Sequence, residues 1–303
     1  MLTYDQYKVA NSLHEVFDIL DAHPASRILA GATDLLPWAR YGRAGDVHLP
    51  SVIDVSKVPD LKYIKLSGNR IWMGANTTIA EFQNNPLLRE HASVLAQCAV
   101  WFADDQIREQ ATVAGNVINA SPAGDTQPAL LALNTSIRLA RREQGKVLER
   151  LVSLDDFIHG PGKTDLRHEE IVLGFECDST MGYGSAFEKV GHRRSLVIST
   201  VCLAVVAKVS PALHTLQDIR IGIGAVGPIP KRLLDLEARL IGQKVSARLI
   251  REIAEEASDF VQSRSRHGYR REVLVNFVER GVVSAINRGG LKLVRYGEEE
   301  LYV

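Results

Sequence analysis

The stretch Gln110-Ala-Thr-Val-Ala-Gly-Asn-Val-Ile-Asn-Ala-Ser-Pro-Ala-Gly-Asp125 consists almost entirely of small, polar and turn-forming residues. It is too long for an ordinary linker, and long irregular segments of this kind usually carry function. A second stretch of similar character, Ala30-Gly-Ala-Thr-Asp-Leu-Leu-Pro37, follows a short apolar run. Both are suited to let backbone N–H groups approach a diphosphate. The composition of the two stretches is equally compatible with two ordinary tight turns and with two loops that bind one cofactor between them.

A compact α/β unit is predicted around the second of these stretches. Apolar residues within Leu13 to Leu20 recur with the i, i+3, i+4, i+7 spacing of an amphipathic helix. A break at His23-Pro-Ala-Ser26 precedes the apolar run from Arg27 to Ala30, which predicts a strand that stops at Gly31. Ser51 to Val55 predicts a second strand. Residues 1–57 therefore form the first expected unit.

The pattern changes after residue 60, where a second unit begins. The segment YIKLSGNRIWMGA predicts a hairpin with its turn at Ser67-Gly-Asn69. Thr77 or Thr78 is placed to cap the next helix, and Glu81 supports that cap. A further helix is predicted over Leu87 to Phe102.

The rest of the chain predicts more strands and then helices. With 303 residues the chain is long enough for more than one core, and its character shifts around Ser179-Thr-Met-Gly182. We expect a domain over 1–178 with subdomains 1–57 and 58–178, a smaller domain over 179–288, and a tail over 289–303. The predicted elements are strands over Leu130 to Ala140, Glu170 to Glu176, Leu196 to Val209 and Asp218 to Ala225, and helices over Lys231 to Ile241 and Ser246 to Val261.

Composition excludes several functional classes. Lys+Arg and Asp+Glu number 36 each, which argues against a nucleic-acid or anionic-membrane binder, because either needs a basic excess. No apolar run is long enough to span a bilayer, and no signal peptide is recognisable, so we expect a cytoplasmic protein. Cys98, Cys177 and Cys202 lack CxxC spacing and predict small buried hydrophobes rather than metal ligands.

Two segments resemble known nucleotide-binding motifs but lack features that those motifs require. Gly222-Ile-Gly-Ala-Val-Gly227 fits GxGxxG, yet Pro228 and Pro230 prevent a helix from starting where it would hold a pyrophosphate. A structural strand end is the better interpretation. Gly160-Pro-Gly-Lys-Thr164 resembles the end of a Walker A loop, but Phe157 stands where the first glycine belongs, which favours an ordinary loop.

A set of short motifs resembles the FAD-binding subunits or domains of molybdenum hydroxylases, the xanthine dehydrogenase and carbon monoxide dehydrogenase flavoprotein family. Each motif alone is weak, but their order and spacing are specific, and together they cover nearly the whole chain. The motifs are Leu29-Ala-Gly-Ala-Thr-Asp-Leu-Leu-Pro37, Gly74-Ala-Asn-Thr-Thr78, Gln106-Ile-Arg108, Ala111-Thr-Val-Ala-Gly-Asn116, Asn119-Ala-Ser-Pro-Ala-Gly-Asp125, Glu170-Ile-Val172 and Phe187-Glu-Lys-Val-Gly-His-Arg-Arg194.

The resemblance implies an α+β fold and a bound FAD. The fold is an FAD-binding unit of the vanillyl-alcohol oxidase (PCMH) type in two subdomains, followed by a smaller α+β domain like the C-terminal domain of carbon monoxide dehydrogenase flavoprotein. The first diphosphate loop would run from Ile28 to Leu35. The full set of implied cofactor-binding residues is Ile28, Leu29, Ala30, Gly31, Ala32, Thr33, Asp34, Leu35, Phe102, Thr112, Gly115, Asn116, Asp125, Val172 and Lys189.

Distinct roles follow for several of these residues from the same resemblance. Phe102 would pack near the isoalloxazine, Asp125 would bond a cofactor hydroxyl, and Val172 would contact the cofactor. Lys189 would lie at the flavin or its edge, where a cation stabilises the charge of reduced flavin. Trp101 is more simply a core residue than a flavin contact.

Alanine departs from the family pattern at two positions. Many members carry paired glycines where this chain has Gly31-Ala32 and Ala114-Gly115. Because alanine disfavours positive φ, we expect ordinary dihedral angles at Ala32 and Ala114, or slightly remodelled loops. The departures leave FAD affinity open.

The roles of Asp34 and of the segment His192-Arg-Arg194 each have two interpretations. Asp34 fits an Asx-type hydrogen bond within its own turn as well as a cofactor contact, since a carboxylate repels a diphosphate. His192-Arg-Arg194 fits a solvated charge cluster as well as a group that faces a partner or the cofactor.

The resemblance further implies a role within a complex. A partner subunit with the molybdenum cofactor would oxidise the substrate, and a [2Fe–2S] partner would carry electrons to this FAD and on to NAD⁺ or another acceptor, in a heterotrimer, single or doubled. A purine or another N-heteroaromatic is the favoured substrate. The alternatives are a self-contained FAD reductase of the same superfold, which needs its own substrate pocket and proton donor, and an assembly scaffold without FAD.

Overall fold

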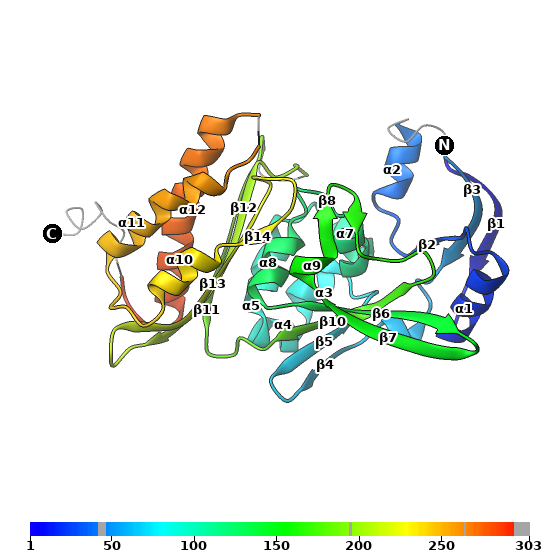
Figure 1. The fold of residues 1–303 in the computed structure, drawn as a ribbon, viewed down its shortest axis with the longest axis horizontal. Helices are drawn as coiled ribbons and strands as arrows, with labels where there is room; N and C mark the ends of the chain where they lie inside the picture. The colour runs from blue at the N-terminus through cyan, green and yellow to red at the C-terminus, as the bar shows by residue number, and fades with distance from the viewer. Residues whose placement is uncertain (42–46, 194–195, 264, 294–303) are drawn as a thin grey trace.

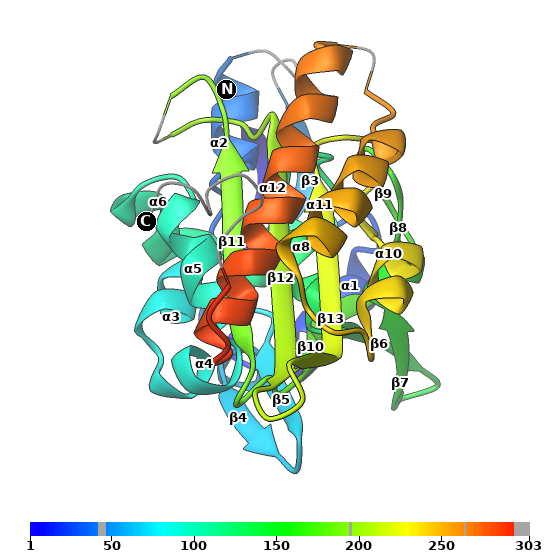
Figure 2. The same ribbon diagram turned by 90° about the vertical axis from the view of Figure 1, so that its left-hand side faces the viewer.

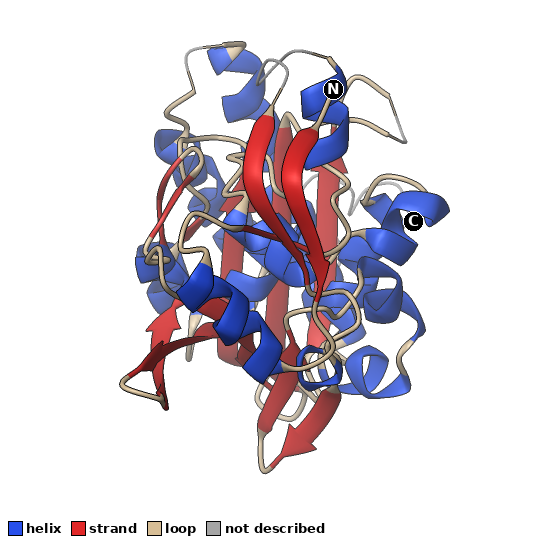
Figure 3. Ribbon diagram, turned by 90° about the vertical axis from the view of Figure 1, so that its right-hand side faces the viewer, coloured by secondary structure: helices blue, strands red, loops and turns tan. Residues whose placement is uncertain are grey.

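The N-terminal end of the chain is a small parallel α/β layer. The computed structural model describes residues 1–41, 47–193, 196–263 and 265–293 (Figure 1). Strands β1 (Thr3–Val9), β3 (His48–Asp54) and β2 (Arg27–Leu29) pair in that order, all parallel. Helices α1 (Leu13–Ala22) and α2 (Leu35–Arg40) complete the layer, which faces the viewer in Figure 3. The helix and both strands predicted here are confirmed.

Local sequence explains what was and was not predictable in this layer. Ser12 caps α1 by accepting a hydrogen bond from the Glu15 backbone at 3.2 Å, and the helix buries Val16 and Phe17. Such a cap and apolar stripe are visible in sequence. Strand β1 was not predicted, because nearly all of its residues are exposed and so show no alternation of buried and exposed positions.

A five-stranded antiparallel sheet follows. Its order is β4 (Ile64–Ser67), β5 (Arg70–Gly74), β10 (Ile171–Asp178), β6 (Ser136–Glu143) and β7 (Lys146–Ser153). The predicted hairpin is confirmed as β4–β5. The shorter elements around this sheet are η1 (Pro59–Leu61), α3 (Ile79–Asn84), α4 (Pro86–His91), α5 (Ser93–Trp101), α6 (Asp105–Gln110), α7 (Val113–Ile118), α8 (Thr126–Ala132), α9 (Leu154–Phe157), β8 (Ile158–Gly160) and β9 (Lys163–Thr164).

Three local predictions for this unit have different outcomes. Thr78 and Glu81 form a complete capping box at the start of α3, as predicted. The single helix expected over 87–102 is wrong, because the chain breaks at Ala92 into α4 and α5. The strand expected from Leu130 is also wrong at its start, where α8 runs instead. All seven residues of α8 are buried, so its apolar run carries no helical periodicity to distinguish it from a strand.

The C-terminal part is a second antiparallel sheet covered by helices. The order is β11 (Gly184–Val190), β12 (Val201–Ser210), β13 (Thr215–Gly224) and β14 (Lys231–Arg232). The two long strands confirm the predictions, although β12 starts later than expected. The outer face of the sheet is covered, as Figure 2 shows, by α10 (Leu234–Leu240), α11 (Ala247–Glu256), η2 (Ala257–Phe260) and α12 (His267–Arg288).

Strand β12 is the centre of this part because both of its faces are buried. Leu203 and Val205 belong to the core shared with the outer helices, whereas Ala204 and Val206 belong to the core shared with the N-terminal part. A strand buried on both faces is continuously apolar, which is the pattern that predicts it. The sheet therefore stands between the outer helices and the N-terminal part of the molecule.

The GxGxxG stretch lies in this sheet and serves packing. A side chain at Gly222 would place its Cβ 2.2 Å from the carbonyl oxygen of Pro128 in α8, and one at Gly224 would meet Cys202 Sγ at 2.8 Å. The glycines therefore let α8 lie directly on β13, which confirms the structural interpretation. The Gly160 segment is an ordinary β8–β9 turn in which Gly162 has a φ of +67°.

Several remaining expectations have simple outcomes. All three cysteines are free and buried, as predicted. Arg194 and most of the expected tail, residues 294–303, lie outside the described residues. Among the residues that are described, no helix is both long enough and apolar enough to cross a membrane.

The contact between α8 and β13 predicts that a methyl group added at Gly222 lowers the stability of the protein. Gly222→Ala should lower the free energy of unfolding by at least about 2 kcal/mol, because the new Cβ meets backbone that cannot rotate away. Gly268→Ala is the matched control, since nothing lies within 4 Å of its Cβ position and alanine favours its helix, raising stability by about 0.5 kcal/mol. Urea unfolding measures both; equal stabilities would contradict the packing argument.

Candidate cofactor site

The first predicted loop presses against the start of the second. It leaves β2, turns through Ala30 to Asp34 and enters α2. A Cβ at Gly31 would lie 1.9 Å from the carbonyl oxygen of Gln110, the last residue of α6. Only glycine permits that approach. The structure thus brings together the two small-residue stretches that the sequence places 80 residues apart.

The second predicted loop begins at Thr112, which caps the helix α7 that follows it. Thr112 precedes α7, and its Oγ1 accepts a hydrogen bond from the Gly115 backbone at 3.1 Å. The backbone of Val113 donates to Thr77 at 2.9 Å, which fixes the loop against the chain before α3. Thr112 is buried, but Gly115 is exposed. The exposed part of this loop is therefore its glycine backbone, which can accept a closely approaching ligand.

A side-chain hydrogen bond joins the two loops directly. Asn119 Nδ2, just after α7, donates to Asp34 Oδ2 at 2.8 Å. Asp34 is the N-cap residue of α2 but makes no side-chain capping bond there. Its carboxylate therefore ties the first loop to the second segment, a role that neither sequence-based interpretation of Asp34 included.

The motif Gly74-Ala-Asn-Thr-Thr78 connects the parallel layer to the five-stranded sheet. Asn76 is buried, and its Nδ2 donates to the carbonyl of Val55 at the end of the parallel sheet, at 2.7 Å. The Ala75 backbone donates to Leu173 in β10 at 3.0 Å. A buried amide with a backbone partner fixes relative position more sharply than apolar packing does. This motif thus fixes the parallel layer on the five-stranded sheet.

Asn116 points inward from the second loop. Its Oδ1 accepts a 2.6 Å hydrogen bond from Thr126 Oγ1, in the first turn of α8. The carbonyl oxygen of Asn116 lies 3.5 Å from Gln127 Nε2. The side chain of Asn116 therefore fixes α7 on α8.

Asp125 and Lys189 meet at the other end of the site. Lys189 Nζ donates to Asp125 Oδ2 at 2.6 Å and to the Trp101 carbonyl at 3.1 Å, and Ser199 Oγ donates to Asp125 Oδ1 at 2.6 Å. Asp125 and Lys189 are 8% and 6% exposed. Burial raises the pKa of the Asp125 carboxyl, while the Lys189 cation opposes that rise. We call Asp125, Lys189 and Ser199 the Asp125 cluster.

The Asp125 cluster draws on both halves of the molecule. Asp125 precedes α8 in the N-terminal part, whereas Lys189 lies in β11 and Ser199 just before β12. Sequence reasoning missed Ser199, because an isolated serine in a loop carries no signal for a buried hydrogen bond made 74 residues away. The pairing of Asp125 with Lys189 was likewise not visible in sequence.

The remaining predicted residues flank these groups. Ile28 and Leu29 lie in β2 and are half-buried, like Phe102, which ends α5 beside half-buried Trp101. Val172 is nearly covered inside β10, opposite Leu139 of β6, and takes no part in the contacts that join the loops.

One of the two alanine predictions is wrong. Ala114 lies inside α7 and has ordinary helical geometry, as expected. Ala32 has a φ of +52°, in the left-handed region. Gly31 is fixed against Gln110, and the chain must still turn into α2 within three residues, so the strained conformation falls on Ala32.

Comparison with known proteins defines the family of the chain. Residues 3–177 match the family described as FAD binding domain in molybdopterin dehydrogenase, and residues 185–285 match the CO dehydrogenase flavoprotein C-terminal domain. The first match covers more than half of the chain, so the chain belongs to this family of oxidoreductases, whose cofactor is FAD. The predicted family, fold class and cofactor are confirmed.

Individual relatives agree along nearly the whole chain. The nicotine 6-hydroxylase medium subunit of Paenarthrobacter nicotinovorans is 30% identical, over 92% of this chain and 96% of the relative. The glyceraldehyde dehydrogenase medium chain of Sulfolobus acidocaldarius is 29% identical, over 88% and 93%. A crystal structure of carbon monoxide dehydrogenase from Hydrogenophaga pseudoflava, lacking the Mo-pyranopterin moiety, has a chain 25% identical with a TM-score of 0.84, covering 93% of this chain and 97% of that one.

The two alanines predict opposite responses to glycine. Ala32→Gly should raise the free energy of unfolding by up to about 1 kcal/mol, because it removes the cost of a left-handed alanine. Ala114→Gly should lower it by about 1 kcal/mol, because glycine destabilises a helix interior. Thermal and urea unfolding of both variants check the prediction. Destabilisation by Ala32→Gly would show that this loop is not strained.

Proposed function

We propose that this chain binds FAD between the two loops and serves as the electron outlet of a molybdenum hydroxylase complex. The observation that carries the proposal is the close approach of Gly31 to the Gln110 carbonyl, which brings two distant small-residue stretches together. Residues 28–35 and Thr112, Gly115 and Asn116 would hold the diphosphate. The exposed Gly115 has no side chain that would keep a ligand away from its backbone, which fits a diphosphate held close to the main chain.

The Asp125 cluster fits a place beside the flavin ring. An ammonium group has three N–H donors, and the carboxylate of Asp125 and the carbonyl of Trp101 accept two from Lys189. The third can donate to a carbonyl or nitrogen acceptor of the isoalloxazine. Each oxygen of Asp125 can accept a second hydrogen bond, which fits the assignment to a cofactor hydroxyl. Phe102 and Val172 complete the assignment as apolar contacts.

The chain's own residues would bind, orient and tune the cofactor. FAD supplies the ability to accept and release electrons, while the protein supplies position and charge. The Lys189 cation favours negative charge on the ring, and Asp125 keeps that cation in place. The catalytic substrate pocket would then belong to another subunit, which distinguishes this proposal from a self-contained FAD reductase.

The proposed partners are those that the resemblance to molybdenum hydroxylases implies. A [2Fe–2S] subunit would deliver electrons from a molybdenum-cofactor subunit, and NAD⁺ or another acceptor would take them, in a heterotrimer, single or doubled. The nicotine 6-hydroxylase medium subunit supports an N-heteroaromatic substrate for the molybdenum partner. Three free, buried cysteines fit a reducing compartment such as the cytoplasm.

We also propose domain boundaries at residues 57/58 and 178/179, with a tail from residue 289. The parallel layer, the five-stranded sheet and the helix-covered sheet support these divisions.

An absorbance spectrum of the purified chain tests cofactor binding. We expect flavin bands and FAD on release, and no flavin in Gly31→Val, whose larger side chain separates the loops. Circular dichroism of the variant shows that it is still folded, and Gly268→Val on the outer helix is a matched control that keeps its flavin. Wild-type protein that stays colourless in added FAD would support the assembly scaffold instead.

The flavin midpoint potential tests the role of Lys189. Lys189→Met should lower the two-electron potential by about 30 mV, the equivalent of about 1.4 kcal/mol of lost stabilisation of the reduced ring. Lys146→Met, at an exposed lysine on β7, should leave it unchanged. Equal potentials in wild type and Lys189→Met would remove Lys189 from the site.

A further inference from the structure

Helix α8 and the C-terminal sheet lie side by side and are joined at both ends. Helix α8 starts directly after Asp125 and is followed closely by Asn134. At one end, Asp125 holds Lys189 of β11 and Ser199. At the other end, Asn134 belongs to a second group of charged residues from both halves of the molecule. Between the ends, Gly222 of β13 touches the Pro128 backbone.

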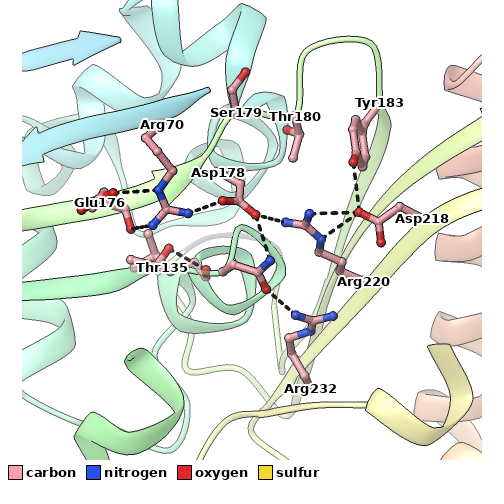
Figure 4. Close-up of polar contacts among 12 residues, drawn as sticks. Arg70, Thr135, Glu176, Asp178, Ser179, Thr180, Tyr183, Asp218, Arg220 and Arg232 are labelled. Carbon is pink, nitrogen blue, oxygen red and sulfur yellow. Dashed lines mark hydrogen bonds and ion pairs between the residues drawn. The ribbon is translucent and has the colours of Figure 1, made fainter. Parts of the chain in front are cut away.

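We call this second group the Asp178 cluster (Figure 4). Its centre is the carboxylate of Asp178, at the end of β10. Oδ2 of Asp178 accepts hydrogen bonds from Arg220 Nη1 and from Asn134 Nδ2, each at 2.8 Å, while Oδ1 pairs with Arg70. The members from the N-terminal part are Arg70, Asn134, Glu176 and Asp178, and those from the C-terminal part are Tyr183, Asp218, Arg220, Arg232 and Glu237.

Arg220 is the residue that crosses between the two halves. Its guanidinium contacts Asp178 at 2.8 Å on one side and Asp218 Oδ2 at 2.9 Å on the other, and its side chain is 12% exposed. Tyr183 Oη, just before β11, donates to Asp218 Oδ2 at 3.0 Å. Charge-assisted bonds of a planar guanidinium to two carboxylates fix orientation as well as distance. Burial makes them stronger than exposed ion pairs.

Arg232 makes a second crossing from β14. It bonds the side-chain oxygen of Asn134 and pairs with Glu237, whose Oε1 lies 3.1 Å from Arg232 Nε. Glu237 is buried and also accepts from the Ile221 backbone at 2.7 Å. Asn134, two residues after the end of α8, is thus fixed to the core of the C-terminal part.

The strands connect the Asp178 cluster to the Asp125 cluster. Lys189 pairs with Cys202 of β12, and Cys202 pairs with Gly224 of β13. Arg220 precedes Gly224 by four positions in β13, about 13 Å along the strand. The close contact of Gly222 with α8 lies between them and leaves no room for a shift of register.

We propose that the Asp178 cluster positions the C-terminal sheet on α8 and thereby sets the placement of Lys189 against Asp125. Arg220 and Asp178 are positioning residues that act through Lys189. The inference rests on the proposed flavin role of Lys189 for its effect on potential, but its geometric part stands on the described contacts.

The test uses the full chain with two cluster variants and one control. Arg220→Met removes the crossing guanidinium while keeping an unbranched apolar side chain, and Asp178→Asn, nearly isosteric, serves if the first variant does not fold. Arg239→Met is the control, because Arg239 pairs with Glu256 at the exposed outer helices. Folding of each variant is checked by circular dichroism.

The first readout needs no FAD. Cys98 and Cys202 are fully buried at the Asp125 cluster, where Cys98 Sγ lies 3.2 Å from the Asp125 carbonyl, and burial raises the pKa of both thiols. They react with a thiol reagent only on local opening. We expect Arg220→Met and Asp178→Asn to label at these two sites about tenfold faster than wild type or Arg239→Met, as measured by peptide mass spectrometry. Unchanged labelling would overturn the proposal.

The second readout is the flavin potential in two backgrounds. Arg220→Met should shift the potential in the direction of Lys189→Met, by at least half as much, and should add nothing in a Lys189→Met background. A full additional shift in that background, or none in wild type while Lys189→Met shifts, would overturn the positioning role but leave the proposed function intact. If wild type binds no FAD, the proposed function fails, and the labelling rates still decide the positioning of Lys189.

Discussion

The approach of Gly31 to the Gln110 carbonyl is the constraint on which the site depends. Because Gly31 has no side chain, the loop after β2 can lie directly on the backbone at the end of α6. Two further contacts, from Asn119 to Asp34 and from Asn76 to Val55, hold that arrangement from either side. The left-handed geometry of Ala32 follows from the same constraint, since the chain has few residues left in which to turn.

The second half of the site depends on the way α8 lies on β13. Helix α8 is buried on all sides, and glycines at positions 222 and 224 let it approach the strand. That packing brings Asp125 to Lys189 across the boundary between the two halves. An isolated buried charge is costly, so Asp125 and Lys189 stabilise each other at this boundary. The proposed cofactor site therefore depends on the packing of the two halves, and a change in either is expected to affect both.

Much of this organisation was predictable from sequence, and the failures have physical causes. Short motifs in a fixed order predicted the family, the fold class and FAD, and amphipathic or doubly buried segments predicted α1 and β12. The prediction failed at α8, where complete burial removes periodicity, and at β1, where almost complete exposure does the same. The dihedral angle of Ala32 could not be predicted, because it is imposed by the contact of Gly31 with Gln110, which lies 79 residues further along the chain. The contact of Ser199 with Asp125 and the contacts of the Asp178 cluster join residues far apart in sequence, and no local sequence pattern indicates such pairings.

The most direct test of the account is a crystal structure of the chain with FAD bound. The account predicts that the diphosphate lies between residues 28–35 and 112–116, close to the backbone of Gly31 and Gly115, and that Lys189 Nζ lies within hydrogen-bond distance of the isoalloxazine while keeping its contact with Asp125. A diphosphate bound elsewhere on the chain, or a flavin ring remote from Lys189, would contradict it.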